Sequence, residues 1–364
     1  MSYVTQETID RVTNVLLRGS YQMKQAVLRE TPINPPNGRT SMFAQNQITQ
    51  DFSKLKITNV SDMICFIKFG VIDRDQIGAM TFITKYPHEL TTVASRIGWI
   101  PCWFLPWTSG HIIKLKIKSF ATDPVLNFGN GIDPVANPDL FFTAGINGCS
   151  VFAVGAADAP SMYHGGINPG SEIAMPLQVN EITETAWRRL LGRGATVKFV
   201  GSVGKHDYIT ELVDPNTTDD TNRYRYNNFK TTRLAADLEG RLTNAGQLTR
   251  IVVSPWGAVF GLRNPTTDNW SMTLVKNSTL VYRRIVITVK KRILRSDKII
   301  TEHRGEIRAA QGLGRTADGL ADLTQNVGNL SEMDISRTIN LGYSEFFPGG
   351  GVTSIRNINI NTIY

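Results

Sequence analysis

Cysteine is scarce in this chain, and long apolar runs are missing altogether. Only three cysteines occur in 364 residues, at positions 65, 102 and 149, and no Cys-x-x-Cys pair is present. An odd, scattered set cannot form a disulfide framework, and reduced thiols suit action in the cytosol. No run of roughly 18 apolar residues exists, so we expect no membrane span. The polar start from Met1 to Glu7 lacks the features of a signal peptide.

Motifs for metals and cofactors are also missing. The five histidines are far apart in the sequence, and none stands at ligand spacing from a cysteine. The Gly-rich stretches at 128–131 and 312–314 are not followed by the Gly-Lys-Ser/Thr of a phosphate-binding loop, and no Gly-x-Ser-x-Gly elbow occurs. We therefore expect neither a metal nor a cofactor.

The residues that are abundant favour strands and turns. The chain has 31 glycines and 16 prolines, and its 41% hydrophobic and 19% charged content is that of a globular protein. We predict an α+β, β-rich fold, in which a mixed β-sandwich is flanked by a few helices. We divide the chain into an N-terminal helical arm at 1–35, a β-rich catalytic domain at 36–305 and a Gly-rich C-terminal extension at 306–364.

Periodic patterns place the elements along the chain. Residues 5–29 predict a helical arm with Ile9, Val12 and Leu16 on one face and Thr5 as its N-cap. The arm either docks on the body or binds a partner, and we favour docking. The other expected elements are a helix at 184–191, strands at 63–69, 111–118, 197–203, 280–289 and 358–364, and a hairpin at 251–260 that turns at 254–257. In 111–118 aliphatic residues alternate with lysines, which predicts one buried and one charged face.

An aromatic stretch at 98–107 contains Trp99, Trp103 and Trp107 within nine positions. Its two prolines argue against a central strand. The stretch is either a core plug beneath a functional site or an aromatic wall for a substrate, and we favour the core.

The most informative feature is a cysteine and a histidine across a predicted β-hairpin. Residues 150–154 are apolar and β-prone, residues 155–160 read as a loop, and a second short strand follows through His164. Folding about that loop brings Cys149 close to residues 164–166. This prediction depends on the register, because a slip of one residue would put His164 on the opposite face.

A thiol beside an imidazole at a strand end is suited to nucleophilic catalysis. The histidine takes the proton, and the resulting ion pair lowers the pKa of the thiol. Backbone amides of Asn147 and Gly148, with that of Cys149, would hold an oxyanion. A third group should orient the imidazole, and the candidates are Asp207, Asn168 or a backbone carbonyl in 110–145. The alternative is that Cys149 is a buried structural thiol, as we expect for the other two cysteines.

These residues resemble the catalytic domain of the cytotoxic necrotizing factor family. The shared pattern is a small-residue loop that ends in Gly148 and Cys149, followed fifteen residues later by His164 on an adjacent strand. The related injected Photorhabdus toxin is similar. The resemblance implies a β-sandwich flanked by helices, which deamidates a switch glutamine of Rho-family GTPases with Cys149 as nucleophile and His164 as base. It also implies a bacterial toxin or effector, made in the bacterial cytoplasm and injected or carried into a host cell.

Other functions remain open at this point. The same two groups would catalyse transglutamination or peptide cleavage with other substrates, and other thiol hydrolases, such as chemotaxis receptor deamidases, share the order of cysteine and histidine. A second hypothesis is a non-catalytic subunit of a phage or secretion assembly. A third is a basic nucleic-acid-binding protein, because the net charge is +8 and a basic run extends from Arg283 to Lys298. A solvated sheet edge also explains that run, so nucleic acid is disfavoured.

Overall fold

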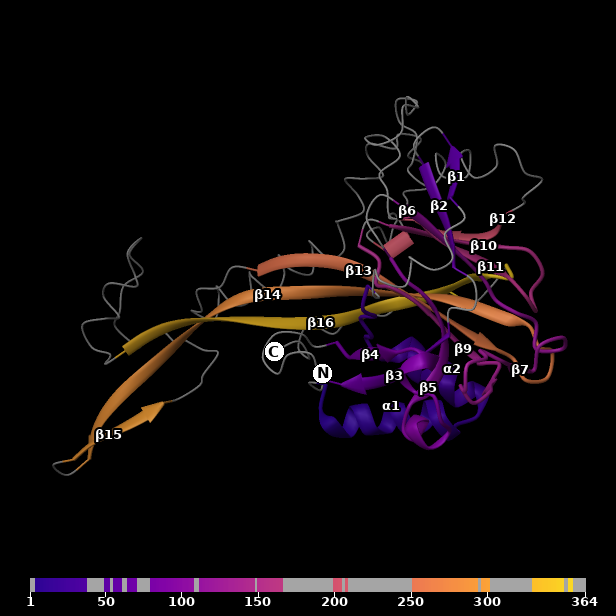
Figure 1. Cartoon of the computed structure of the whole chain (residues 1–364). Coiled ribbons are helices and arrows are strands. Elements are labelled where there is room, and N and C mark those ends of the chain that lie inside the picture. The colour runs from indigo at the N-terminus through magenta and orange to yellow at the C-terminus, as the bar shows by residue number, and fades with distance from the viewer. Residues whose placement is uncertain are drawn as a thin grey trace, which may run out of the picture.

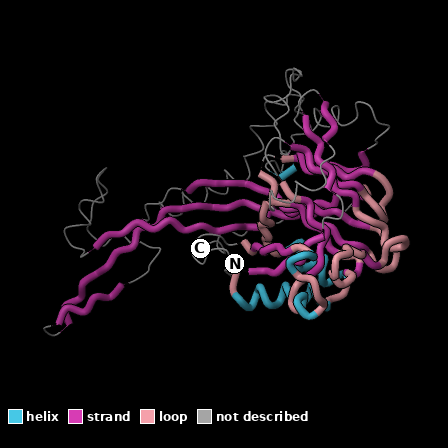
Figure 2. Tube along the Cα trace, in the orientation of Figure 1, coloured by secondary structure: helices cyan, strands magenta, loops and turns pink. Residues whose placement is uncertain are grey.

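The computed structural model describes most of the chain and leaves several segments aside. The described residues are 4–37, 49–52, 55–60, 64–70, 79–107, 111–147, 149–165, 199–204, 207–208, 251–293, 296–301, 329–349 and 353–355. Within them the fold is α+β and mostly β, with two α-helices and two large mixed sheets (Figures 1 and 2). The predicted fold class is therefore confirmed. The predicted helix at 184–191, the predicted strand at 358–364 and the candidate residue Asn168 lie outside the described residues.

The smaller of the two large sheets has six strands. In order across the sheet they are β1 (Thr49–Phe52), β2 (Leu55–Val60), β6 (His111–Lys116), β11 (Ser161–Gly165), β10 (Ser150–Val154) and β12 (Phe199–Val203). All neighbours are antiparallel except β2 and β6. Ile113 and Leu115 of β6 are fully buried, whereas Lys116 is exposed, as the alternation predicts.

The larger sheet has nine strands and continues into a long ribbon. Its strands in order are β17 (Thr353–Ile355), β16 (Asn329–Phe347), β14 (Trp270–Ile293), β13 (Ile251–Arg263), β9 (Leu140–Thr143), β5 (Ile100–Leu105), β3 (Ile64–Gly70) and β4 (Thr81–Lys85), and β15 (Ser296–Thr301) also pairs with β14. A separate two-stranded sheet joins β7 (Val125–Leu126) and β8 (Val135–Ala136). Figure 1 shows β14 and β16 extending far beyond the body, with β15 near the outer end.

The arm consists of two helices, where the sequence predicts one helical segment. α1 (Gln6–Arg18) and α2 (Tyr21–Glu30) are separated by Gly19, whose backbone is extended, and by Ser20, whose hydroxyl accepts the backbone N–H of Met23. Thr5 caps α1 as predicted. The helices dock on the larger sheet, as predicted: Lys24 pairs with Asp139 at 2.7 Å.

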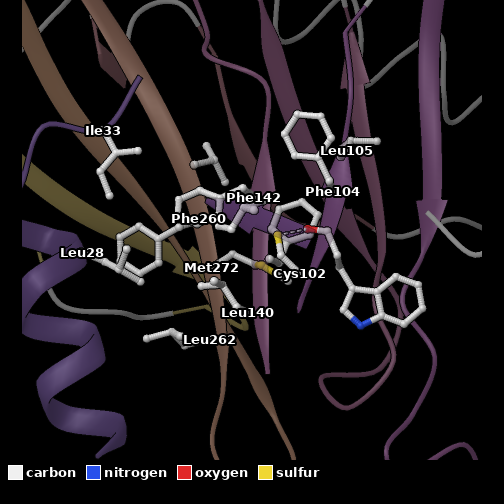
Figure 3. Close-up of a cluster of buried hydrophobic side chains, with 14 of the residues drawn as sticks. Leu28, Ile33, Cys102, Phe104, Leu105, Leu140, Phe142, Phe260, Leu262 and Met272 are labelled. Atoms are coloured by element: carbon white, nitrogen blue, oxygen red, sulfur yellow. Dashed lines mark hydrogen bonds between the residues drawn. The ribbon is translucent and has the colours of Figure 1, made fainter. Parts of the chain in front are cut away.

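The larger sheet separates two layers of the core. Leu140 and Phe142 alternate with Phe141 and Thr143 along β9, so the two pairs point to opposite faces. Figure 3 shows the face that carries Phe142, with Leu28 of α2 near Phe260. The opposite face carries Thr143, whose hydroxyl contacts His164 in β11 of the six-stranded sheet. The body is therefore layered as helices, larger sheet and smaller sheet.

Two predictions about single strands are wrong. Residues 251–263 form one continuous strand and do not turn at 254–257. Pro255 is tolerated because, among the described residues, the edge of β13 opposite β14 is paired from Gly257, which bonds to Ile146, and at 260–262, which pair with β9. The aromatic stretch contains β5, a central strand between β9 and β3. Pro101 lies at its second position, which limits the cost of the missing N–H.

The C-terminal residues are integral to the larger sheet. Residues 329–347 were predicted to belong to a separate extension after residue 305, but they form β16, which pairs with β14 from Met272 to Thr288. The arm is tied to the same strand, because Arg29 of α2 lies 3.0 Å from the carboxylate of Glu345. These described C-terminal residues therefore do not form a body of their own.

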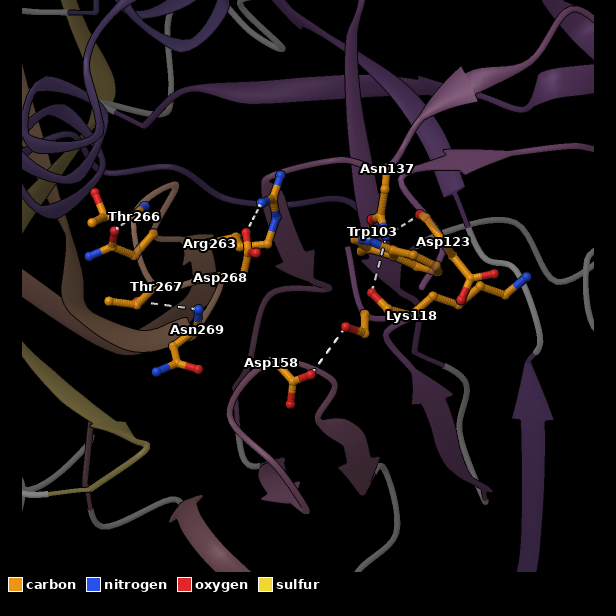
Figure 4. Close-up of polar contacts among 12 residues, drawn as sticks. Trp103, Lys118, Asp123, Asn137, Asp158, Arg263, Thr266, Thr267, Asp268 and Asn269 are labelled. Carbon is orange, nitrogen blue, oxygen red and sulfur yellow. Dashed lines mark hydrogen bonds and ion pairs between the residues drawn. The ribbon is translucent and has the colours of Figure 1, made fainter. Parts of the chain in front are cut away.

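A polar cluster fixes the loops that cover β5. Trp103 is fully buried, and its indole N–H donates to Asn137 Oδ1 at 3.0 Å. The Asn137 amide donates in turn to the carbonyls of Lys118 and Asp123 (Figure 4). Trp103 is therefore core, as we favoured for the aromatic stretch. The segment just after it, which ends at Trp107, reaches the candidate site.

Candidate functional site

The site is built on the hairpin of β10 and β11, and the predicted hairpin is confirmed. Ser150 pairs with Gly165 and Val151 pairs with His164 in antiparallel register. Gly155 has φ +97°, a conformation that glycine adopts without strain, at the point where the chain leaves β10. Cys149 directly precedes β10.

The described register ends one residue short of Cys149, and its extension would place the cysteine and the histidine on one face. Directly paired residues point to the same side of a sheet, and residues two apart in one strand also do so. Val151 is paired with His164 and lies two residues after Cys149. If the register is continued by one residue, Cys149 and His164 are diagonal neighbours, a relation that separates Cα atoms by about 7–8 Å.

His164 is held between the two sheets. Its side chain is 1% exposed, and His164 also pairs with Ile113 of β6 on its other side. The ring atom Nδ1 lies 2.7 Å from the hydroxyl oxygen of Thr143, at the end of β9 in the larger sheet. This bond fixes the rotation of the imidazole, because it joins the ring to a strand of the opposite layer.

The group that orients the histidine is not one of the residues predicted for that role. Asp207 accepts the backbone N–H of Gly204 at 2.7 Å, and the group bonded to His164 is Thr143. Thr143 lies in the range 110–145, where a backbone carbonyl was expected, but it acts through its side chain. The sequence feature that could have pointed to Thr143 is its place at the end of a buried apolar strand. Asn168 lies outside the described residues.

The other ring nitrogen has no partner in the described part of the chain. Nε2 of His164 is buried and makes no hydrogen bond among the described residues. Burial lowers the pKa of His164 to about 3, because the charged ring would lose its hydration. The imidazole is therefore neutral at physiological pH. In the tautomer whose Nδ1–H donates to the Thr143 hydroxyl, Nε2 is the acceptor for a proton.

Cys149 differs from the other two cysteines in exposure. Cys65 and Cys102 are fully buried, whereas Cys149 is only partly buried. Burial raises the pKa of the Cys149 thiol to about 11. Two neighbouring N–H groups act on the pKa in the opposite direction: the Trp107 side chain and, more weakly, the backbone N–H of Asn147. The sulfur thus lies next to donors that favour its thiolate form.

The residues around the cysteine come from three parts of the chain. Trp107 follows β5, Asn147 precedes the hairpin, and Tyr208 donates its phenol hydrogen to the Cys149 carbonyl at 2.9 Å. Asn147 was predicted as a backbone donor, and its N–H does face the thiol, whereas Gly148 lies outside the described residues. Trp107 and Tyr208 were not predicted at the site, although the aromatic stretch that contains Trp107 and the residue before Tyr208, Asp207, were both singled out.

The resting pair is neutral, which differs from the predicted ion pair. No hydrogen bond joins Cys149 and His164 in this structure, and burial moves their two pKa values away from those of a thiolate–imidazolium pair. Catalytic hydrogen bonds are often long before substrate binds. The arrangement is suited to transfer of the thiol proton to Nε2 during attack on a substrate.

The described part of the chain contains no cluster of three or more His, Cys, Asp or Glu side chains that would hold a metal ion. Neither of the two described helices has the length and apolar character needed to cross a bilayer. No known protein-family model and no curated protein matches the chain.

Proposed function

We propose that the chain is a thiol hydrolase that deamidates a glutamine side chain of a host protein. The observation that carries this proposal is the hairpin register, in which Val151, two residues after Cys149, pairs with His164. The Thr143 bond supports it, because it orients the imidazole while Nε2 has no partner among the described residues. A nucleophile, a base and a group that orients the base form the arrangement required for acyl transfer.

The first half of the reaction forms a thioester. The thiol proton moves to His164 Nε2 while Sγ of Cys149 bonds to the amide carbon of the glutamine, and the carbonyl electrons move to oxygen. The backbone N–H of Asn147 is the nearest candidate donor for that oxyanion. When the carbonyl reforms, the carbon–nitrogen bond breaks, and the nitrogen takes the proton from Nε2 and leaves as ammonia.

The second half releases glutamate. A water molecule gives a proton to Nε2 as its oxygen attacks the thioester carbon. The second tetrahedral intermediate collapses with loss of the carbon–sulfur bond, and the proton returns to the sulfur. The net change is glutamine plus water to glutamate plus ammonia. An amine in place of water would give transglutamination instead.

The finer assignment comes from the resemblance to the necrotizing factor family. It makes the substrate a switch glutamine of a Rho-family GTPase, and the chain a bacterial toxin or effector that is delivered into the host cytosol. The supporting features in this chain are the small-residue loop up to Cys149 and the fifteen-residue spacing to His164.

The test uses the full-length chain and a purified, GDP-loaded Rho-family GTPase. Peptide mass spectrometry follows conversion of the switch glutamine to glutamate. We expect conversion by the wild type, none by Cys149→Ala, and a loss of about 100-fold or more in His164→Gln, since general base catalysis contributes about 10²–10⁴-fold. His88→Gln, at an exposed histidine, is the control. Equal conversion by wild type and Cys149→Ala would exclude the nucleophile, and an unmodified GTPase would exclude this substrate.

The second candidate is a subunit of a larger assembly, and the ribbon favours it. β14 has 24 residues, so at about 3.3 Å per residue it spans about 80 Å. Few-stranded ribbons are marginally stable alone, and a partner surface would stabilise one. Sedimentation of the purified chain tests this candidate. Oligomers that form equally with Cys149→Ala, together with no deamidation, would favour the assembly role.

A further inference from the structure

Trp107 lies beside the segment that leads to the nucleophile. β5 and β9 are parallel, and Leu105 pairs with Thr143. The pairing continues past both strand ends, because the backbone N–H of Ala144 donates to the Leu105 carbonyl at 2.9 Å. The residues after Leu105 therefore run next to the residues that lead to Cys149.

The indole N–H of Trp107 is buried and has no full hydrogen bond. The side chain is partly exposed, but Nε1 is inaccessible and makes no ordinary hydrogen bond to the described residues. A buried donor without an acceptor costs free energy, so it needs an explanation. The Cys149 sulfur, on which this side chain acts, provides one, since a neutral thiol is a weak acceptor and a thiolate is a strong one.

We propose that the Trp107 indole N–H stabilises the negative charge that develops on the Cys149 sulfur when the thiol gives up its proton. The inference deepens the proposed hydrolase function and rests on it. The hydrogen bond from the indole N–H is weak to the resting thiol and strong to the thiolate. An interaction that strengthens only as charge develops lowers the barrier to attack.

The electrostatics of the thiol agree with this role. Burial opposes the thiolate and raises the pKa of Cys149, while Trp107 is the stronger of the two groups that lower it. The second is the backbone N–H of Asn147. Because His164 is neutral in the resting site, the charged partner of the sulfur arises only with the proton transfer, and neutral donors such as the Trp107 N–H add to its stabilisation.

Other tryptophans show that a buried N–H alone does not define such a site. Trp103 donates to Asn137 and is satisfied within the core. Trp270 has a buried N–H without a partner among the described residues, but it does not act on the Cys149 thiol. Trp107 combines the unpartnered donor with a neighbouring nucleophile, and this combination carries the inference.

The test measures alkylation of Cys149 by iodoacetamide in the full-length chain from pH 7 to pH 10, with the site identified by mass spectrometry. Two variants remove the donor: Trp107→Phe, and replacement of Trp107 by benzothienylalanine, which keeps the bicyclic shape but lacks the N–H. Trp99→Phe, whose ring packs near Phe66 and Leu90, is the control. We expect both donor variants to react about tenfold more slowly than wild type at each pH, the effect of raising a thiol pKa by about one unit.

The outcomes separate the inference from the proposed function. Slower alkylation in both donor variants with an unchanged Trp99→Phe supports the role of Trp107. A benzothienylalanine variant that reacts within about twofold of wild type overturns it, because the N–H then has no effect on the sulfur. Glutamine deamidation by the wild type is measured separately, so its absence would count against the hydrolase and not against the effect of the N–H on the thiol.

Discussion

The neutral state of His164 makes stability depend on pH in a way that one substitution should remove. The folded pKa is about 3, against an ordinary value of 6.5. Between these values the unfolded chain binds a proton at this residue and the folded chain does not. The unfolding free energy therefore falls as the pH falls from 6.5 towards 3. The contribution of the neutral His164 to the stability of the fold is fully present above pH 6.5 and is lost over that range.

The size of the effect follows from the linkage relation. Each pKa unit corresponds to about 1.4 kcal/mol, so the full shift would be worth about 5 kcal/mol between pH 6.5 and pH 3. Between pH 6 and pH 4 the loss is about 2–3 kcal/mol, after the partial protonation of the unfolded chain at pH 6 is taken into account. His164→Gln has no titrating group at this position. Between pH 6 and pH 4 its unfolding free energy should therefore fall by about 2–3 kcal/mol less than that of the wild type.

The assay is urea denaturation of wild type and His164→Gln at pH 6, 5 and 4, followed by far-ultraviolet circular dichroism. Acidic groups titrate in both proteins, so the difference between the two curves isolates His164. His88→Gln, at an exposed histidine, is the matched control for loss of a histidine. Parallel pH dependences for wild type and His164→Gln would refute the buried neutral imidazole and the proton acceptor that depends on it.

Three further predictions concern the neighbours of the site and the core. Thr143→Val should lower the unfolding free energy by about 1–3 kcal/mol in urea melts, because it leaves Nδ1 of His164 unpaired. Thr143→Ser keeps a hydroxyl and should lose less than half as much. Equal losses in the two variants would contradict the hydrogen bond. In the native chain, iodoacetamide should label Cys149 before the two fully buried cysteines, and peptide mass spectrometry should show a labelling rate that rises with pH up to pH 9. A labelling rate that reaches its plateau below pH 7 would indicate a preformed thiolate–imidazolium pair. Asn137→Ala should cost about 1–3 kcal/mol in thermal or urea unfolding, since the Trp103 N–H loses its acceptor, and an unchanged midpoint would show that water replaces the amide.

The hairpin of the site could be predicted because its signals are local. An apolar strand, a loop of small residues and a returning strand fix the pairing of Val151 with His164 to within the few registers that the loop allows. Thr143 could not be found in the same way. Its bond to His164 crosses from one sheet to the other and depends on tertiary packing. The direction of both pKa shifts also depends on burial, which a one-dimensional pattern does not show.

The long ribbon was only partly predictable. Residues 280–289 read as a strand, but the strand continues for 24 residues because β16 pairs along it. Met333, Ile335, Ile339 and Leu341 alternate with other residues in β16, so the sequence does carry a strand period there. At 254–257 the Pro-Trp-Gly sequence is typical of a turn, and pairing of β13 with β14 overrides it.

The central claim is that Cys149 and His164 convert a glutamine of a host protein to glutamate. The most direct measurement is quantitative peptide mass spectrometry of a eukaryotic cell extract incubated with the wild-type chain, Cys149→Ala or His164→Gln. We predict at least one glutamine that becomes glutamate with the wild type and remains unchanged with Cys149→Ala, with much slower conversion by His164→Gln. An extract in which the wild type and Cys149→Ala give the same glutamine and glutamate peptides would contradict the claim.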